Sequence, residues 1–394
     1  MLRIAYFSPL PPQRTGIADY SAELVPYLAE LSEVTLYVPD PAAVSAPLRD
    51  RFTVLDDARF PQQRWSHDVI LYHVGNSLFH RPIYDMLLRY PGVTVLHDHV
   101  LHHFLLETTL GEEDFPAYVR ELAYARGLGG QALAHAIRRG EQPIPLYGWP
   151  LSRRVVDLSL GVVVHSDAVR RRVRAMCPES CVAHIHHLLP LPMPRDRELV
   201  RASLDLPADA FVIVTAGLMT PEKCPEVVID AFRRFHRHHP QAVWLVVGQA
   251  GIDGRWSAPD LGDAVRHLGY VEGMDAFYDA LAAGDVCISL RYPTTGETSG
   301  AVLRAMAVGR PVVVSNLEWY AELPDDCCPK VEHDGREADQ LYRVLERLFV
   351  QPETRAAMGR RARDYVARNS DPRTVAQDYV AFLGSVLDSL AGER

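Results

Sequence analysis

Two kinds of apolar pattern alternate along almost the whole chain. Short runs of β-branched and other apolar residues are typical of buried strands in a parallel sheet, whereas longer segments with an apolar residue every three or four positions are typical of helices. In the first half of the chain we expect strands at residues 2–7, 34–38, 69–72, 93–96 and 162–165. In the second half we expect strands at residues 211–216, 243–247, 285–290 and 311–315.

Helical segments connect these predicted strands. We expect helices at residues 22–31, 225–236 and 300–308. Two successive series of strands and helices predict an α/β protein with two Rossmann-like, doubly wound domains. The segment 189–194 has a proline at every second position, which favours the extended backbone of a linker. We therefore place an N-terminal domain at 1–191 and a C-terminal domain at 192–373.

Residues 98–149 form an insertion without a strand pattern in the N-terminal half. Helical spacing is expected within it at 114–125 and 131–139. Its basic residues include Arg120, Arg126, Arg138 and Arg139. Their spacing favours a solvated helix face, and contact with an acidic acceptor or with lipid headgroups is the alternative.

The composition is that of an ordinary globular protein. Hydrophobic residues make up 48% of the 394 positions and charged residues 23%, which suits packed cores and argues against a disordered or fibrous chain. The net charge of −9 provides no overall positive field, so nucleic acid is not an expected partner. The sequence has neither a membrane-spanning apolar run nor the apolar core of a signal peptide. We expect a cytoplasmic protein, with peripheral contact with the inner face of the membrane left open.

Histidines and cysteines are the usual ligands of transition metals, but their spacing here does not predict a metal site. His99 and His103 have the i, i+4 spacing of two ligands on a helix face, yet no third ligand follows nearby. The six cysteines lack the paired spacing of a zinc site. We expect reduced, mostly buried thiols and no bound metal.

Glycine, proline and charged residues gather in the segments that follow predicted strands, which are 8–16, 97–99, 217–223 and 291–300. Ligands bind open parallel sheets beyond the carboxyl ends of the strands, so two sheets that face each other would form one deep cleft. Ser299 is expected to cap the helix at 300–308, whose free backbone N–H groups suit a phosphate. Lys223 would add a cation, although a lysine after a strand is more often a solvated surface charge.

Four segments together resemble a known family. They are Pro11-Pro12 with Gly16-Ile17-Ala18-Asp19-Tyr20-Ser21, the stretch from Gly217 to Lys223, the strand end Gly269-Tyr270-Val271, and the block from Gly296 to Val314. Over nearly its full length the chain is similar to the retaining glycosyltransferases of family 4, also called glycosyl transferases group 1. The resemblance implies the GT-B fold, with two Rossmann-like domains facing across a cleft, and a hexosyltransferase that uses a nucleotide diphosphate sugar. It also implies that the C-terminal helix, 374–394, returns to the first domain.

The resemblance assigns the donor phosphates to the second domain. Lys223 is implied to hold the diphosphate. The loop and helix start at Glu297, Thr298, Ser299 and Gly300 are implied to hold the donor sugar and its phosphates. Of these residues, Lys223 and Glu297 are the expected catalytic ones.

Further residues are implied at the edges of the donor. Val271 is expected to border the base, and Gly16 lies on a loop that approaches the diphosphate from the first domain. His97 is the third expected catalytic residue, because the resemblance places a histidine here near the donor sugar, where an imidazole can bind a hydroxyl or assist proton movement. Asp19 and Asn76 are expected in cleft loops, where they contact acceptor or donor, or cap the loops themselves.

The chain departs from the family pattern at three positions. Leu218 stands where an arginine usually precedes the lysine by five residues. Arg304 stands where a second glutamate usually grips the ribose, and the first glutamate, Glu297, fits only with a shift of one residue. We expect Arg291, at the end of a predicted strand, to replace the cation missing at Leu218.

The sequence contains no Asp-x-Asp motif, so protein groups must meet the negative charge that develops on the departing diphosphate. We therefore expect a metal-independent transferase with no cofactor besides its nucleotide-sugar donor, which is linked to UDP or GDP. Glycan, lipid-linked and small-molecule acceptors all remain open, and we expect residues 98–149 to select among them. The alternatives are a nucleotide-sugar epimerase or hydrolase and a non-catalytic nucleotide-sugar-binding protein.

Overall fold

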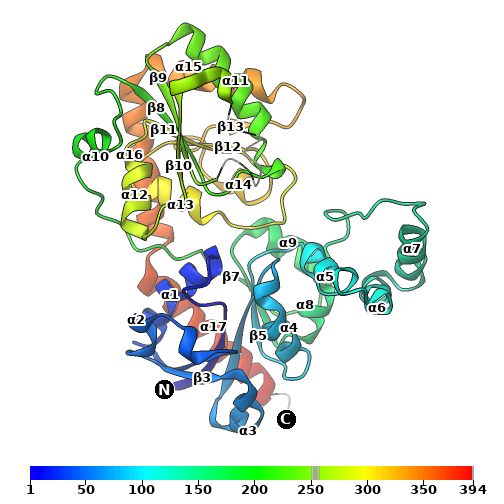
Figure 1. The fold of residues 1–394 in the computed structure, drawn as a ribbon. Coiled ribbons are helices and arrows are strands. Elements are labelled where there is room, and N and C mark those ends of the chain that lie inside the picture. The colour runs from blue at the N-terminus through cyan, green and yellow to red at the C-terminus, as the bar shows by residue number, and fades with distance from the viewer. Residues whose placement is uncertain (250, 252–255, 257, 393–394) are drawn as a thin grey trace. The chain divides into compact units, whose positions relative to one another are not determined.

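The computed structural model describes residues 1–249, 251, 256 and 258–392. The chain divides into two compact units, each built around its own parallel sheet (Figure 1). Unit 1 contains Met1–Leu188, Thr295–Thr298 and Pro372–Arg394, and unit 2 contains Leu189–Thr294 and Ser299–Asp371. The division at Leu188 immediately precedes the proline-rich segment, and the last helix belongs to unit 1.

Unit 1 contains a seven-stranded sheet with the strand order β3-β2-β1-β4-β5-β6-β7, and all of its neighbouring strands are parallel. Its strands are β1 (Leu2–Phe7), β2 (Ser32–Val38), β3 (Thr53–Asp56), β4 (Val69–Val74), β5 (Val93–Leu96), β6 (Gly161–Val164) and β7 (Val182–His184). The five predicted strands are confirmed. The two edge strands, β3 and β7, are missing from the prediction because they are short and lack a continuous apolar run.

Helices cover both faces of this sheet because alternate residues of each strand point to opposite sides. On one face, Tyr6 of β1 packs with α1 (Gly16–Leu28) and α17 (Pro372–Gly392). On the other face, Phe7 packs with helices from the middle of the unit. These include α4 (Arg81–Leu87), α5 (His102–Glu107), α6 (Phe115–Arg126), α7 (Leu128–Arg138), α8 (Arg153–Leu158) and α9 (Asp167–Met176). The short helices α2 (Ala46–Arg49) and α3 (Phe60–Gln63) complete unit 1.

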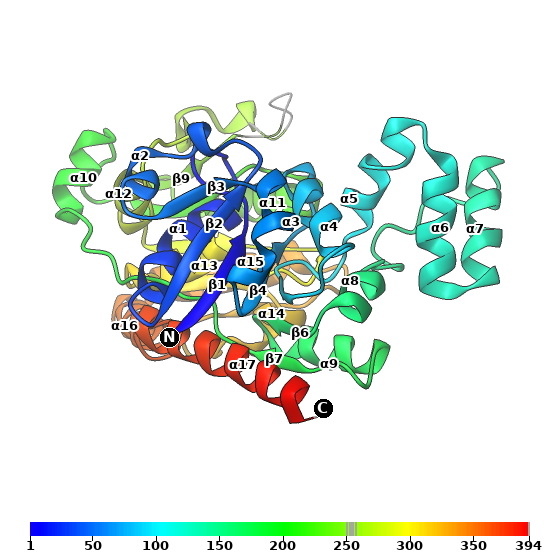
Figure 2. The same ribbon diagram turned by 90° about the horizontal axis from the view of Figure 1, so that it is seen from below.

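The insertion at 98–149 is helical, as its spacing predicts, and no strand lies within it. Figure 2 shows α6 and α7 side by side. Their close approach depends on Gly130, since a Cβ built there would fall 1.9 Å from the carbonyl oxygen of Leu122. The two helices are joined at Gly127, whose φ of +58° favours glycine.

Unit 2 contains a six-stranded parallel sheet in the order β10-β9-β8-β11-β12-β13. Its strands are β8 (Phe211–Ala216), β9 (Ala242–Val247), β10 (Val265–Gly269), β11 (Val286–Ser289), β12 (Val312–Ser315) and β13 (Lys330–Val331). One face carries α12 (Met274–Ala282), α13 (Gly300–Ala307) and α16 (Pro352–Asn369), and the other carries α11 (Pro225–His238) and α15 (Glu337–Val350) (Figure 1). The remaining helices are α10 (Arg197–Ser203) and α14 (Glu318–Glu322).

Two expectations about local structure are wrong. The first helix begins at Gly16 and not at residue 22, because the Thr15 hydroxyl accepts a hydrogen bond from the Ile17 N–H and caps it there. Gly16 and Asp19 therefore lie in the first turns of α1 and not in a loop. His99 and His103 do not share a helix face, because α5 begins only at His102.

Candidate functional site

In unit 1, His97 follows directly after β5 and is partly exposed. Its Nε2 atom lies 2.9 Å from the Nδ1 atom of His73, a fully buried residue of the neighbouring strand β4. The Nδ1 atom of a third histidine, His80, lies 3.0 Å from the backbone carbonyl oxygen of His73. β4 and the end of β5 thus place two imidazoles in contact near the carboxyl end of the sheet, and a third imidazole, that of His80, contacts the backbone of the first.

Tyr20 of α1 is the centre around which these histidines gather. Its ring centroid lies between 4.6 and 5.8 Å from those of His73, His97, His165 and His187. Its hydroxyl lies 2.8 Å from that of Tyr379, which joins α1 to α17. The cluster was not predicted, because its members come from distant segments.

Burial favours the neutral imidazole at four of these histidines, because it lowers the pKa of each. It lowers the pKa of His97 and of His73 well below the ordinary value, and nearby His165 lowers both pKa values further. Burial lowers the pKa of His80 and of His165 to about 4. Burial therefore favours the unprotonated form of His97, which is the form that a general base requires.

The loop segment Thr295–Thr298 is part of unit 1 and contacts Asp98, the residue after His97. The Thr295 hydroxyl oxygen lies 2.7 Å from Oδ1 of Asp98 and 2.8 Å from Oε2 of Glu297. The Glu297 carboxylate also accepts the backbone N–H of Thr295 at 2.9 Å. In addition, the Thr298 hydroxyl donates to the carbonyl oxygen of His165 at 3.3 Å. The expected catalytic Glu297 is thereby fixed within its own loop.

The side chain of Asn76 forms hydrogen bonds that stabilise the loop in which it lies. Its Oδ1 atom accepts the backbone N–H of Phe104 at 2.9 Å, and its Nδ2 atom lies 3.0 Å from Nδ1 of His103. Its own backbone N–H donates to Oδ2 of Asp98 at 2.9 Å. These contacts favour the loop-capping alternative for Asn76, and its contact with a ligand stays a prediction.

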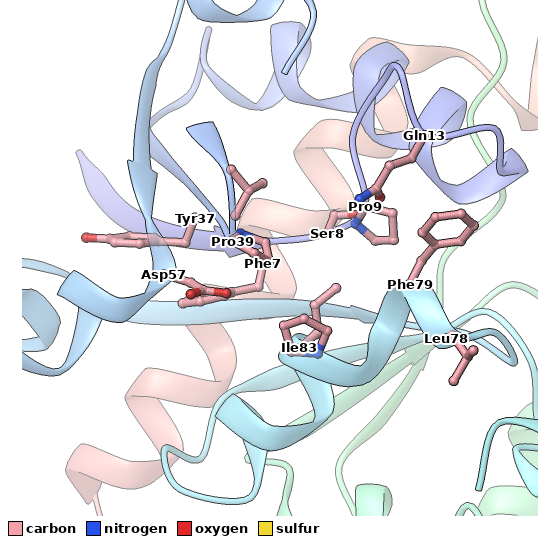
Figure 3. Close-up of a pocket in the computed structure, with 12 residues that line it drawn as sticks. Phe7, Ser8, Pro9, Gln13, Tyr37, Pro39, Asp57, Leu78, Phe79 and Ile83 are labelled. Carbon is pink, nitrogen blue, oxygen red and sulfur yellow. The ribbon is translucent and has the colours of Figure 1, made fainter. Parts of the chain in front are cut away.

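A cavity of about 210 Å³ lies at the carboxyl ends of β1 and β2 (Figure 3). Its wall combines the aromatic ring of Tyr37 with polar groups from Ser8, Gln13 and Asp57. Burial raises the pKa of Asp57, and the neighbouring Asp56 raises it further. At the rim, Phe79 is 46% exposed, so this edge of unit 1 offers an apolar surface beside polar groups.

In unit 2, Lys223 lies at the carboxyl edge of the sheet. Its ammonium donates to the carbonyl oxygen of Ala216, the last residue of β8, at 2.8 Å. Gly217, which follows, has a φ of +84°, and a Cβ built there would fall 2.6 Å from the Lys223 ammonium. Glycine at 217 therefore leaves room for the lysine head beside the strand end.

The start of α13 lies at the same edge. Ser299 caps this helix as predicted, because its hydroxyl oxygen accepts the backbone N–H of Val302 at 3.3 Å. Arg291 lies two residues beyond β11, and its backbone N–H donates to the hydroxyl oxygen of Ser315 in β12 at 2.9 Å. Val271 lies two residues beyond β10. The sheet therefore carries each of these residues to its carboxyl edge.

Arg304 has a position that the sequence did not predict. It is 5% exposed, and its Nε atom lies 3.1 Å from the sulfur of Met274. A Cβ built on Gly300 would fall 2.7 Å from Nη1 of Arg304, so the guanidinium lies beside the first turn of α13. A positive charge there adds to the partial positive charge of the helix N-terminus. The signal that could have found it is the spacing of four residues between Gly300 and Arg304.

Residues 196–365, which include all of these unit 2 positions, match the family described as glycosyl transferases group 1. Through this region, which we call the group 1 domain, the chain is similar to that family. The group 1 domain therefore covers Lys223, Arg291, Ser299 and Arg304, together with most of unit 2.

Curated relatives are similar to part of this chain. The D-inositol 3-phosphate glycosyltransferase of Saccharomonospora viridis is 30% identical over 216 residues, which are 50% of this chain and 49% of the relative. A GDP-mannose-dependent monoacylated α-(1-6)-phosphatidylinositol monomannoside mannosyltransferase of Corynebacterium glutamicum is 29% identical over 181 residues, 44% of this chain and 47% of the relative. The chain thus spans about half the length of the curated relatives it matches.

Solved structures match the fold over both units. HepE of Anabaena, solved in complex with UDP-glucose, aligns with a TM-score of 0.69 and 16% identity, over 98% of this chain and all of that one. Sucrose-phosphate synthase of Thermosynechococcus elongatus aligns with a TM-score of 0.67 and 17% identity, over the full length of both chains. At this identity the likeness concerns the fold, and it confirms the predicted class of two Rossmann-like α/β domains.

In the part of the chain that the structure describes, no group of three or more His, Cys, Asp or Glu side chains is arranged to hold a metal ion. The searched helices also include none long and apolar enough to cross a bilayer. All six cysteines are free thiols, and four of them are buried.

Proposed function

We propose that this protein is a retaining, metal-independent glycosyltransferase that moves a sugar from a UDP- or GDP-linked donor to an acceptor hydroxyl. The observation that carries the proposal is the group 1 domain at residues 196–365. That region includes the cations and the helix start at the carboxyl edge of the unit 2 sheet, where ligands of open parallel sheets bind. The names of the relatives support transfer to an acceptor, as opposed to isomerisation or hydrolysis of the donor.

The chemistry of transfer requires stabilisation of the diphosphate, because negative charge grows on its bridging oxygen as the anomeric bond breaks. Unit 2 offers the ammonium of Lys223 and the capped N-terminus of α13 for this purpose. Arg304 lies beside that helix start. The helix N-terminus alone contributes about 0.3–1 kcal/mol to anion binding at an exposed site, and each charge-assisted hydrogen bond adds a similar or larger amount.

Two donor bases are retained in the proposal because the named relatives use both. HepE of Anabaena binds UDP-glucose, and the Corynebacterium glutamicum relative is GDP-mannose-dependent. Arg304 replaces the glutamate that would grip the ribose, so the ribose contacts of this chain must differ from those of the usual pattern.

Unit 1 supplies the acceptor side of the reaction in this proposal. His97 follows β5 and holds a neutral imidazole in contact with His73. Asp98 and Glu297 lie next to it in the loop network around Thr295. In the proposed reaction His97 binds a sugar hydroxyl or accepts the proton that the acceptor hydroxyl loses.

The test is incubation of the full chain with a panel of UDP- and GDP-linked sugars, with and without a set of polyol, sugar and lipid-linked acceptors. Release of nucleotide diphosphate that depends on an acceptor, with the anomeric configuration of the product retained in its NMR spectrum, supports the proposal. Isomerisation or hydrolysis of the donor without an acceptor indicates an epimerase or hydrolase. Donor binding without any turnover indicates a non-catalytic protein and overturns the proposal.

A further inference from the structure

A second and larger cavity in unit 1, of about 480 Å³, lies where the helical insertion meets the body of the unit. Three arginines line it: Arg126 ends α6, Arg153 begins α8 and Arg172 lies in α9. His99 and Trp149 complete its polar and aromatic wall. Its volume falls within the range of small-molecule sites.

The charge of this cavity is opposite to that of the whole protein. None of the described residues that line it is acidic, whereas the chain as a whole carries a net charge of −9. Arg153 pairs with Asp157 at 3.3 Å, so part of its charge is offset. The Arg126 guanidinium lies 5.6 Å from the centre of the Trp149 ring, and within the described residues Arg126 has no ion pair with a carboxylate.

The third arginine, Arg172, lines the cavity together with His99, which is close in sequence to the candidate catalytic residue His97. Burial, together with the positive charge of Arg172, lowers the pKa of His99 to about 4. The Nδ1 atom of His99 lies 3.4 Å from the hydroxyl oxygen of Ser152. His99 follows His97 by two residues, and Gly296 packs so closely on it that a Cβ at 296 would fall 2.8 Å from the His99 Cβ.

Three guanidinium groups around one cavity match the chemistry of a phosphate. Each guanidinium presents paired N–H donors that fit two oxygens of a phosphate group, and a phosphate monoester carries up to two negative charges. The remaining wall, including Trp149, Leu151 and Met176, is apolar and suits the C–H face of a sugar or polyol ring. All three arginines are exposed, so a dissolved ligand can reach them directly.

We infer that this cavity, which we call the arginine pocket, binds a phosphate monoester on the acceptor. The inference rests on the proposed function, because it names the class of acceptor: a phosphorylated sugar or polyol whose free hydroxyl receives the transferred sugar. It also gives the insertion a role, since Arg126 and Trp149 belong to it. The sequence alone assigned the basic residues of the insertion to a solvated face, and three of them fit that assignment. Arg120 lies 3.8 Å from Asp114, Arg138 stacks on Phe115, and Arg139 pairs with Glu141.

The binding test uses the full chain without donor. Calorimetric titrations with glucose 6-phosphate, glycerol 3-phosphate and inorganic phosphate are compared with titrations of glucose and glycerol. We expect glucose 6-phosphate and glycerol 3-phosphate each to bind at least tenfold more tightly than its unphosphorylated parent. We also expect Arg126→Gln and Arg172→Gln each to weaken that binding at least fivefold, with melting temperatures close to that of the unaltered protein.

Arg120→Gln is the matched control, since it removes the same charge from α6 at an exposed position outside the pocket. We expect it to leave phosphate binding unchanged. Equal binding of phosphorylated and unphosphorylated compounds overturns the inference. Equal losses in Arg120→Gln and Arg126→Gln also overturn it, because they would reflect net charge alone.

The phosphate could belong to a soluble acceptor or to a lipid headgroup, and a flotation experiment distinguishes them. The vesicles contain phosphatidylcholine alone or with 20 mol% phosphatidic acid, which is a phosphate monoester. Flotation with phosphatidic acid that is lost in Arg126→Gln assigns the monoester to a lipid. Binding of the soluble esters without flotation assigns it to a soluble acceptor. Absence of both overturns the inference.

Failure of the inference and failure of the proposed function give different results. If the phosphate compounds bind through the arginines but no nucleotide sugar is turned over, the transferase proposal fails and the anion site stands. If nucleotide sugars are turned over with acceptors that lack phosphate, and the arginine variants transfer to them at the rate of the unaltered protein, the arginine pocket has no part in acceptor binding.

Discussion

The Nδ1 atom of buried His73 lies 2.9 Å from the Nε2 atom of His97, across the neighbouring strands β4 and β5. Both rings are neutral because burial lowers both pKa values, so one ring donates a hydrogen bond and the other accepts it. The contact fixes the orientation of the His97 ring. We therefore expect His73 to act as a positioning residue and the more exposed His97 to be the one that meets a ligand.

The first prediction concerns this pair. We expect His97→Ala to lower kcat by about 100-fold or more, as loss of a proton-transfer group does, and His73→Ala to lower it by roughly tenfold through disorder of the His97 ring. The KM for the donor should change less than twofold in both variants, as measured by release of nucleotide diphosphate. His239→Ala, which removes a histidine paired with Glu346 in unit 2, is the control and should retain full activity. A His73→Ala enzyme with the kcat and pH profile of the unaltered protein would contradict the positioning role.

The second prediction concerns the cations of unit 2. We expect Arg304→Ala and Arg291→Ala each to weaken UDP or GDP binding by about 1–2 kcal/mol, or roughly five- to thirtyfold, because each removes a charge-assisted contact with phosphate. Isothermal titration with the free nucleotides measures this loss. Arg233 of α11 forms an exposed ion pair with Asp260, and Arg233→Ala should leave nucleotide affinity unchanged. Unchanged donor affinity and turnover in Arg291→Ala would remove this residue from the donor site.

The third prediction compares two adjacent glycines of α7. A Cβ at Gly130 would fall 1.9 Å from the Leu122 carbonyl oxygen, whereas a Cβ at Gly129 meets nothing within 4 Å. We expect Gly130→Ala to destabilise the insertion by about 1–3 kcal/mol, because α6 and α7 must move apart. Gly129→Ala should be neutral or stabilise it by up to about 1 kcal/mol, since alanine favours helix. Urea unfolding and proteolysis within 98–149 measure the difference, and equal stability of the two variants would contradict the close packing.

The fourth prediction concerns acid stability. His80, His99, His102 and His165 have pKa values lowered to about 4, mainly by burial, against about 6.5 in an unfolded chain. Between these values the unfolded chain binds more protons than the folded one, so stability falls as the pH falls. The contribution of each neutral histidine is fully present above pH 6.5 and is lost progressively towards pH 4, at about 1.4 kcal/mol per pKa unit at most. Urea midpoints measured at pH 7, 6, 5 and 4.5 should decrease in that order, and a constant midpoint would contradict the burial of neutral imidazoles.

The fifth prediction concerns metal dependence. Protein cations and the N-terminus of α13 meet the charge of the diphosphate in the proposed reaction, so EDTA should leave the rate of nucleotide diphosphate release unchanged. Addition of magnesium or manganese after dialysis against EDTA should give no increase. A rate that the chelator abolishes and either ion restores would contradict the metal-independent mechanism.

By itself, the sequence determined the local and periodic features of this protein. Strands such as β1 and β8 are buried on both faces and are therefore continuous apolar runs that can be read directly. Edge strands such as β3 carry no such run, and the start of α1 depends on one hydrogen bond at Thr15. The cap at Ser299 is also local, since the serine and Val302 are three residues apart.

Only the tertiary structure decided which distant residues meet. His73 reaches His97 because β4 and β5 are neighbours in the sheet, and the arginine pocket forms because α6, α8 and α9 pack around one space. Arg304, which the sequence marks only as a departure from the family pattern, lies beside the helix start at Gly300. Hydrophobic periodicity records which residues are buried. It does not record which buried surfaces face each other, and the packing of segments far apart in the chain settles that.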